Sequence, residues 1–350
     1  MNYIYVKRIQ NIFSTSKFHI MTNLTRMDNM VDFSDIQRAK ERLEGMVNHT
    51  EVTSDLKLGE QLGTEVCLKW ESHQITGAFK VRGGLNTVLS LPEERRESGV
   101  VVSSSGNHGL GVSYAAKQER IPAIVYVPDY ASKKKITAMR ELGAEVRVVD
   151  GGYSLAEERG IRVAKEKGAV FISPYNHPEV IAGQGTIILE WLEQTLDLDT
   201  VLLPVGGGGL GSGIGLAFKV LRPTSHLIGV QTEGSAFLHE NWHGRDIETV
   251  KILPNLADGL TGIVDPQSIT LPLTRRLFDD FQLVNDDEIA RAVAYCYEEH
   301  GEIVEGAAAV GLAALLARKP ENLGRSVGVL ITGGNITPDQ HRDILDRAGV

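Results

Sequence analysis

The sequence predicts an α/β protein in which mostly parallel sheets are flanked by helices. Short apolar runs alternate along the chain with stretches of helical periodicity, which is the pattern of parallel strands joined by crossover helices. Most of these runs are nearly free of polar residues, as expected for strands covered on both faces. Two of them lead into turns rich in serine or glycine and then into helices. Such strand–turn–helix units present free backbone amides and commonly bind anions.

Eight strands and four long helices follow from this reading. The expected strands are residues 66–70, 100–104, 123–127, 145–149, 170–173, 201–205, 227–231 and 327–332. The expected amphipathic helices are residues 132–142, 178–194, 286–300 and 305–317.

The length of the chain predicts about two domains, because domains average roughly 150 residues. No Pro/Ser-rich linker divides its 350 residues, so we expect the two domains to be interleaved rather than consecutive. Residues 1–30 are read as a disordered leader. Their basic residues, with no acid before Asp28, give only a weak likeness to a transit peptide.

Composition excludes several classes of function. The net charge is -9, from 36 Lys+Arg and 45 Asp+Glu, so neither nucleic acid nor an anionic membrane is an expected partner. No apolar run reaches the roughly 18 residues that a spanning helix requires. Cys67 and Cys296 are the two cysteines and form no CxxC pair, which argues against a disulfide scaffold or a cysteine-rich zinc site. A cytoplasmic location fits these features.

The first candidate site is the turn 103–109, which runs from a strand through Ser104, Ser105 and Gly106 to a helix that begins near Asn107. Free amides at the helix start, together with serine hydroxyls, favour a carboxylate or a phosphate. The alternative is an ordinary strand–helix turn in which serine or asparagine caps the helix.

The second candidate site contains four consecutive glycines, Gly206 to Gly209, between a strand and a helix. Ordering four glycines is entropically costly, and close approach of backbone to a phosphate would explain their presence. A dinucleotide site is the competing interpretation. Gly206, Gly208 and Gly211 match G-x-G-x-x-G and Glu233 follows about 20 residues later, although such a fingerprint commonly opens its domain and this one lies past the middle of the chain.

Lys80 is the third candidate. It lies among small and apolar neighbours, from Thr76 to Gly84, at the expected start of a helix. Burial would lower the pKa of its amine and make it nucleophilic, as a Schiff-base lysine must be. A lysine on the surface of a helix is the alternative.

Together these segments resemble the fold-type II pyridoxal-phosphate enzymes, whose fold is like that of the tryptophan synthase beta chain, and within them the serine/threonine dehydratase and serine racemase branch. The resemblance runs from about residue 31 to the C-terminus, through segments 71–80, 104–109, 183–186, 204–210 and 332–335. It implies a large cofactor-binding domain of residues 31–92 and 175–350, a small mobile domain of residues 93–174, and a cofactor between them. Relatives form homodimers or homotetramers.

The resemblance also implies the roles of individual residues. Lys80 would form a Schiff base with pyridoxal 5'-phosphate and then carry the Cα proton of the substrate, with Ser105 as the second catalytic residue. The remaining cofactor-binding residues would be Phe79 beside the ring, Asn107 at the 3'-oxygen, Thr332 at the pyridine nitrogen, and Gly206, Gly207, Gly208, Gly209 and Leu210 at the phosphate. The substrate carboxylate would contact Ser104, Ser105 and His108.

The implied reaction is dehydration and deamination of a β-hydroxy amino acid, first of all L-threonine or L-serine, to a 2-oxo acid and ammonia. A specialised substrate such as 3-hydroxyaspartate, phenylserine or a hydroxyectoine-derived amino acid stays open, as does racemisation of serine. β-Replacement and cofactor binding without catalysis are less consistent with the motifs. No regulatory domain follows the core, so a catabolic role is expected.

One segment departs from the family pattern, and one residue has two possible roles. Gln231 and Phe237 stand where some relatives have the acids of a divalent-cation site, and Glu233 alone offers too few oxygen ligands, so no metal is expected. Glu305 would lie near the pyridine edge of the cofactor by resemblance. It could equally be a first-turn acid favoured by the helix dipole.

Overall fold

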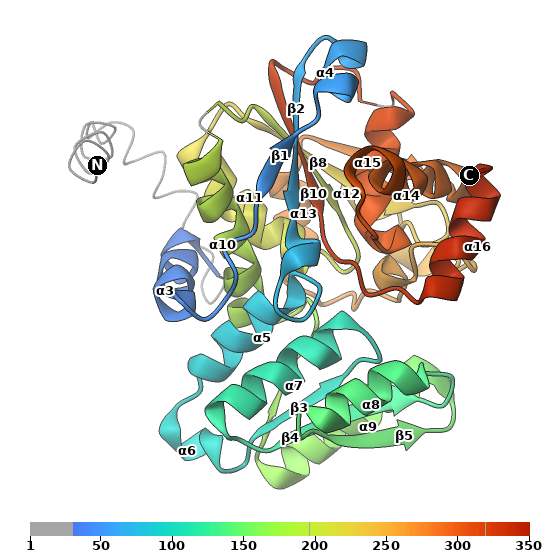
Figure 1. Cartoon of the computed structure of the whole chain (residues 1–350). Helices are drawn as coiled ribbons and strands as arrows, with labels where there is room; N and C mark the ends of the chain where they lie inside the picture. The colour runs from blue at the N-terminus through green and yellow to red at the C-terminus, as the bar shows by residue number, and fades with distance from the viewer. Residues whose placement is uncertain (1–30, 196, 319) are drawn as a thin grey trace, which may run out of the picture.

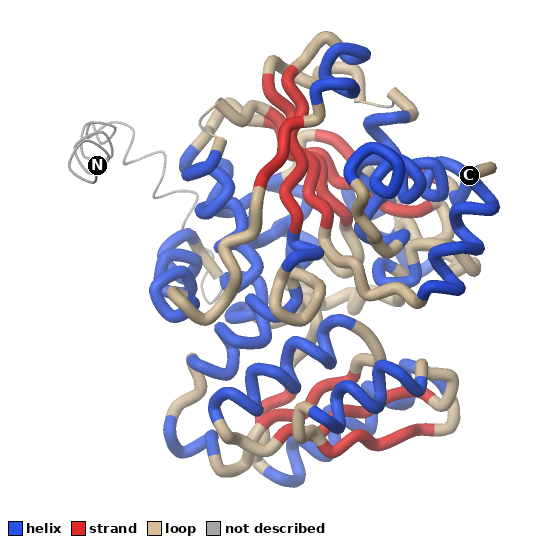
Figure 2. The backbone as a smooth tube through the Cα atoms, in the orientation of Figure 1, coloured by secondary structure: helices blue, strands red, loops and turns tan. Residues whose placement is uncertain are grey.

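The computed structural model describes residues 31–195, 197–318 and 320–350, and the expected leader lies outside the described residues. The chain forms a six-stranded sheet and a four-stranded sheet, each with helices on both faces (Figures 1 and 2). The α/β class with mostly parallel sheets is therefore confirmed.

The larger sheet has the strand order β1-β2-β10-β7-β8-β9, and every neighbouring pair is parallel except β1 with β2. One face packs against helices α3, α10, α11 and α13, and the other packs against α4, α14, α15 and α16. The strands are β1 (Val52–Ser54), β2 (Glu65–Trp70), β7 (Thr200–Pro204), β8 (His226–Thr232), β9 (Asp280–Val284) and β10 (Ser326–Ile331). The helices on its two faces are α3 (Phe33–Leu43), α4 (Leu56–Leu62), α10 (Pro178–Gln194), α11 (Gly209–Leu221), α13 (Thr270–Leu277), α14 (Asp286–His300), α15 (Gly306–Leu316) and α16 (Pro338–Ala348).

The smaller sheet is wholly parallel, with the order β5-β4-β3-β6. Side chains alternate along its strands, so that Val100 and Val102 face α7 and α8 whereas Val101 faces α9. Its elements are β3 (Val100–Ser103), α7 (Asn107–Glu119), β4 (Ala123–Pro128), α8 (Lys133–Glu141), β5 (Glu145–Val149), α9 (Gly152–Lys167) and β6 (Val170–Phe171). The chain thus completes this sheet after β2 and before β7, so the two sheets are interleaved along the sequence.

All eight expected strands are present, with bounds that differ by at most two residues, and helices α10 and α14 have the bounds expected from the sequence. Strands β1 and β9 were not expected. No helix among the described residues is both long and apolar enough to cross a membrane. The other described elements are α5 (Lys80–Leu89), α6 (Glu93–Arg96), α12 (Phe237–Trp242), and the 3-10 helices η1 (Glu71–His73), η2 (Ile247–Thr249) and η3 (Asp258–Leu260).

Glycines let several helices approach at backbone distance. A Cβ added to Gly84 of α5 would lie 2.9 Å from the Gly111 carbonyl of α7, and one added to Gly183 of α10 would lie 2.7 Å from the Arg82 carbonyl of α5. A Cβ on Gly213 of α11 would lie 2.2 Å from the Ile181 carbonyl of α10. The four helices are therefore packed without room for side chains at their crossings. This packing fixes α5 directly against α7, which follows the serine turn, and through α10 against α11, which follows the glycine turn.

Candidate functional site

Lys80 is the first residue of α5, and its side chain is only partly buried. Its amine donates a hydrogen bond to the Pro174 carbonyl oxygen at 2.9 Å and lies 5.1 Å from the centre of the Phe79 ring. Loss of hydration lowers the pKa of this amine to about 8, and the nearby Glu305 carboxyl offsets part of that shift. An appreciable fraction of Lys80 is therefore unprotonated and nucleophilic near neutral pH.

The turn before Lys80 is joined to the end of β10. Phe79 N–H donates to the Thr332 carbonyl, and Gly334 N–H donates to the Gly77 carbonyl. Gly77 has a φ of +71°, and a Cβ there would lie 2.5 Å from Oδ1 of Asn335. The positive φ favours glycine at this position, and an added Cβ would also displace the Asn335 amide. Thr332, which is buried, and Lys80 are thus brought close together from opposite ends of the sequence.

Asn107, the first residue of α7, lies between two polar partners. Its amide Nδ2 donates to the Glu305 carboxylate at 2.7 Å, and its Oδ1 accepts from Asn335 at 2.8 Å. Burial and the charge of Asp258 together raise the pKa of Glu305 to about 7, against the opposing effects of Lys135, Asn107 and Lys80. The alternative role of Glu305, an acid at the start of its helix that the helix dipole favours, does not explain its hydrogen bond with Asn107. The carboxylate orients the Asn107 amide.

The serine turn continues into a buried histidine. His108 Nε2 lies 3.0 Å from the Ile172 carbonyl, which is an acceptor, so this nitrogen carries the proton. Burial, together with the charge of Lys80, lowers the pKa of His108 to about 3. Its Nδ1 is buried without a hydrogen-bond partner. Ser104 Oγ accepts from Gly106 N–H at 3.2 Å, and Ser105 is half-buried in the same turn.

The glycine turn opens α11, whose first residue is Gly209. Gly208 adopts a left-handed φ of +87°, and the Gly207 carbonyl accepts from Thr270 Oγ1 at 2.7 Å. N–H groups in the first turn of a helix have no carbonyl partner within it. They are available to an anion, and Leu210 of the same turn is buried.

Tyr175 connects this turn with Lys80. A Cβ on Gly207 would lie 2.3 Å from the Tyr175 ring, and one on Gly209 would lie 2.8 Å from Tyr175 Cα. Pro174, whose carbonyl accepts from Lys80, is the preceding residue. The glycine turn and the lysine are therefore neighbours.

Comparison with known families decides which cofactor this geometry serves. The family model described as "Pyridoxal-phosphate dependent enzyme" matches residues 44–333. The chain belongs to the pyridoxal-phosphate dependent enzymes. The dinucleotide interpretation of the glycine turn is thereby set aside, and pyridoxal phosphate is the cofactor of this enzyme.

Relatives of the enzyme include several amino-acid lyases and racemases. It is 41% identical over 318 residues to L-threonine ammonia-lyase of Thermotoga maritima, covering 91% of this chain and 79% of the relative. It is 33% identical to L-threo-3-hydroxyaspartate ammonia-lyase of Saccharomyces cerevisiae, covering 89% of this chain and 96% of the relative. The structure of maize serine racemase matches with a TM-score of 0.83 and 33% identity, over 91% of this chain and 97% of that one. These matches confirm the fold-type II class and the serine/threonine dehydratase and serine racemase branch.

The residues of the enzyme fit pyridoxal phosphate chemically. Lys80 supplies an amine with a lowered pKa, and the glycine turn supplies amides for a phosphate. His108 Nδ1, His177 Nδ1 and Thr76 Oγ1 are buried polar atoms that lack a protein partner, as expected around a polar ligand. No cluster of three potential metal ligands occurs among the described residues.

Sequence reasoning missed part of the site. Asn335 belongs to a motif that was noted without a role, and its contact with Asn107 could have been sought there. Pro174 and Tyr175 carry no motif. Their position over Lys80 and the glycines is set by the chain connection between β6 and α10.

Proposed function

We propose that the enzyme dehydrates and deaminates a β-hydroxy amino acid, first of all L-threonine or L-serine, to give a 2-oxo acid and ammonia. The observation that carries this proposal is the amine of Lys80, with its lowered pKa, between two helix-opening anion sites. Similarity over nearly the whole chain to ammonia-lyases for threonine and 3-hydroxyaspartate supports it.

In this proposal the glycine turn, from Gly206 to Leu210, binds the cofactor phosphate. Phe79 packs beside the ring, Asn107 donates to the 3'-oxygen, and Thr332 faces the pyridine nitrogen. Pyridoxal phosphate supplies the electron sink that makes the Cα–H bond acidic. Ser104, Ser105 and His108 hold the substrate carboxylate. The only ring proton of neutral His108 is donated to Ile172, so in this proposal His108 contributes its backbone N–H in the first turn of α7, and not its side chain.

Lys80 is the proposed base. Its amine accepts the Cα proton, and the β-hydroxyl leaves as water. Uptake of one water then releases ammonia, so L-serine gives pyruvate and L-threonine gives 2-oxobutyrate. A base with a pKa near neutrality suits this proton transfer because both of its states are populated.

The test is 2-oxo acid release by the purified protein with added pyridoxal phosphate from L- and D-serine, L-threonine, allo-threonine, both 3-hydroxyaspartates and phenylserine. The fastest turnover is expected with L-threonine or L-serine. Reaction with 3-hydroxyaspartate or phenylserine alone would retain the chemistry and replace the substrate. Absence of turnover with every member of the panel would contradict the proposal for these substrates.

Racemisation of serine is the second candidate, favoured by the match to maize serine racemase. It requires an acid on the face of the substrate opposite Lys80, and we assign that role to Ser105. Formation of D-serine from L-serine, and its loss in Ser105→Ala with 2-oxo acid release retained, would support racemisation.

We further propose that residues 93–174 form a small mobile domain beside a cofactor domain of residues 31–92 and 175–350. A homodimer or homotetramer and a location in the cytoplasm complete the proposal. The net charge of -9 and the small-molecule chemistry of the site support an amino acid, and not nucleic acid, as the partner.

A further inference from the structure

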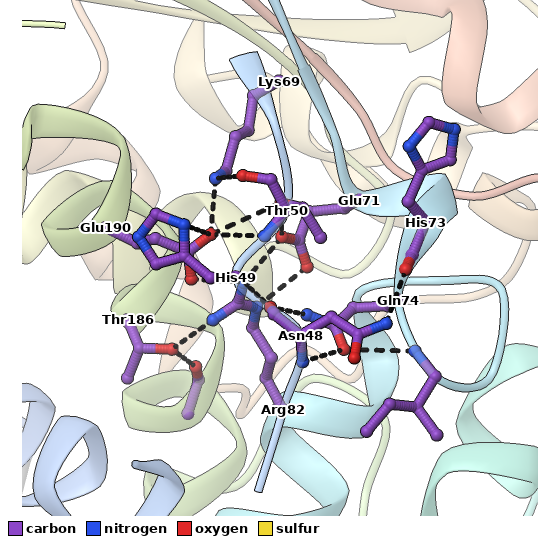
Figure 3. Close-up of polar contacts among 12 residues, drawn as sticks. Asn48, His49, Thr50, Lys69, Glu71, His73, Gln74, Arg82, Thr186 and Glu190 are labelled. Carbon is purple, nitrogen blue, oxygen red and sulfur yellow. Dashed lines mark hydrogen bonds and ion pairs between the residues drawn. The ribbon is translucent and has the colours of Figure 1, made fainter. Parts of the chain in front are cut away.

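A cluster of four buried charges lies beside the candidate site, and the proposed reaction does not use it. Lys69, Glu71 and Arg82 are at most 1% exposed, and Glu190 is 8% exposed. Figure 3 shows that these side chains point toward one another from β2, η1, α5 and α10. Two cations meet two carboxylates, so the cluster is neutral as a whole.

Arg82 and Glu71 form a bidentate ion pair, a planar fork in which two guanidinium nitrogens donate to the two carboxylate oxygens. Arg82 Nε donates to Glu71 Oε2 at 2.8 Å, and Arg82 Nη2 donates to Glu71 Oε1 at 2.7 Å. This planar fork fixes the relative orientation of the two side chains, which a single ion pair does not. The carboxylates beside Arg82 also raise the pKa of its guanidinium, so Arg82 stays charged despite burial.

The pair joins the two ends of one loop. Glu71 begins η1 directly after β2, and Arg82 is the third residue of α5. The chain between them contains the whole turn from Gln74 to Lys80. Because Arg82 lies two residues beyond Lys80 on the same helix, the fork fixes the first turn of α5 relative to the end of β2.

The same loop is anchored at two further places. Arg82 Nη2 also donates to Glu190 Oε2 of α10 at 2.8 Å. The buried side chain of Gln74 donates to the Asn48 carbonyl at 2.6 Å and accepts from the Asn48 amide at 3.1 Å. Lys69, at the far side of the cluster, donates its three ammonium hydrogens to Glu190, the Thr50 carbonyl and Gln194, none of which belongs to the loop.

Stability alone is a weak reason for such a cluster. Buried ion pairs lose much of their attraction to desolvation, and well-packed apolar side chains often replace them without loss. An apolar pair cannot reproduce the fixed orientation that the bidentate hydrogen bonds between Arg82 and Glu71 impose. A catalytic amine, by contrast, is sensitive to displacements of about 1 Å.

We propose that Arg82 and Glu71 are positioning residues, which close the loop 71–82 and hold the Lys80 amine in the orientation that its reaction with the cofactor requires. This inference rests on the proposed role of Lys80. Neither residue touches the reacting atoms, and Lys69 serves the fold on the other side of the cluster.

The experiment measures how fast Lys80 bonds to pyridoxal phosphate. The purified apoprotein is mixed with pyridoxal phosphate, reduced with borohydride at timed intervals, and the label on the Lys80 peptide is quantified by mass spectrometry. Arg82→Lys keeps the charge and loses the fork, and Glu71→Gln keeps the size and loses the charge. Lys69→Met is the matched control inside the cluster, and Arg96→Lys is the control at an ion pair with Glu119 elsewhere.

All variants are compared at one temperature, at least 20 °C below the lowest unfolding midpoint among them, so that neither unfolding nor a temperature difference enters the rate. Arg82→Lys and Glu71→Gln are expected to label Lys80 about 10- to 100-fold more slowly than the wild type. Lys69→Met is expected to lower the unfolding midpoint and label Lys80 within twofold of the wild-type rate, and Arg96→Lys to do the same.

Wild-type rates in both Arg82→Lys and Glu71→Gln would overturn the inference, and so would equal slowing in Lys69→Met. Where Arg82→Lys does not fold, Glu71→Gln decides alone. Absence of label on Lys80 in the wild type would instead contradict the proposed function itself.

Discussion

Single side chains determine the charge state of the site. Glu305 is a buried carboxyl whose ordinary pKa of 4.5 rises to about 7, and it holds the amide of Asn107. Between these two pKa values the folded protein binds a proton that the unfolded chain has lost. The contribution of Glu305 to stability therefore decreases as the pH rises from about 4.5 to 7.

Glu305→Gln removes this titration and keeps an oxygen that can accept from Asn107. The unfolding free energy of the variant relative to the wild-type apoprotein is expected to rise by about 2 kcal/mol between pH 5 and pH 8. Urea unfolding of both proteins at the two pH values measures it. A difference that does not change with pH would show that Glu305 is ionised throughout this range.

A site residue can be identified from the sequence when its distinguishing neighbours are close to it in the sequence. Lys80 and Asn107 were identified because each has unusual neighbours in sequence, namely small residues or a strand–helix turn. Arg82 was not, since an arginine in a helix gives no sign of burial until Glu71 and Glu190 are placed around it. Contacts between distant segments carry no local pattern.

At the scale of elements, the glycine turn shows two constraints acting together. Gly208 is fixed by its positive φ, whereas Gly207 is fixed by the aromatic ring of Tyr175. The sequence predicted the turn correctly but attributed all its glycines to ligand approach. At Gly207 the glycine is explained by packing against the Tyr175 ring.

Gly207→Ala and Tyr175→Ala test this division. Gly207→Ala alone is expected to destabilise the apoprotein by about 1 to 3 kcal/mol through overpacking. In the double variant the two losses should be less than additive, with a coupling of at least about 0.5 kcal/mol. Strictly additive losses in thermal or urea unfolding would mean that the ring does not constrain Gly207.

The connection from β8 to α12 contains the segment in which the sequence predicts no metal site. Gln231 accepts from His239 N–H at 2.7 Å, and its amide lies 3.5 Å from the Gly206 carbonyl. A protein amide thus links α12 to the glycine turn, where the family resemblance would place a cation in some relatives. We predict that dialysis against EDTA leaves turnover unchanged and that added Mg²⁺ does not raise it. A loss that Mg²⁺ restores would contradict this prediction.

Buried central strands were predictable from the sequence, and so were two edge strands, β5 and β6. The eight expected strands are apolar and mostly central, and their limits were found within two residues. β1 has three residues and lies at one edge of its sheet, and β9 lies at the other with the mixed sequence DFQLV. β1 is too short to form an apolar run, and β9 contains Asp280 and Gln282, so neither has the continuous apolar run that reveals buried parallel strands.

For the whole molecule, the interleaved order of the two sheets places segments far apart in sequence at one site. Lys80 precedes the small sheet, Asn107 lies within it, and Glu305 and Thr332 follow it. This convergence explains why separate motifs could be recognised from sequence although their contacts could not.

The solution mass tests the proposed assembly. With a chain of 38.2 kDa, light scattering of the holoenzyme is expected to give a mass of two or four chains. Exposed apolar side chains such as Ile252, Leu253 and Ile263 would be covered in such an assembly. A monomer at micromolar concentration would contradict it.

The most direct test of the central claim compares the wild type with Lys80→Ala. Both proteins are supplied with pyridoxal phosphate, and release of 2-oxo acid from L-threonine and L-serine is measured, with folding checked by circular dichroism. The wild type is expected to release 2-oxobutyrate or pyruvate, and Lys80→Ala is expected to release none above the rate without protein. Turnover by a folded Lys80→Ala at a rate comparable to the wild type would contradict the assignment of Lys80 as the catalytic base.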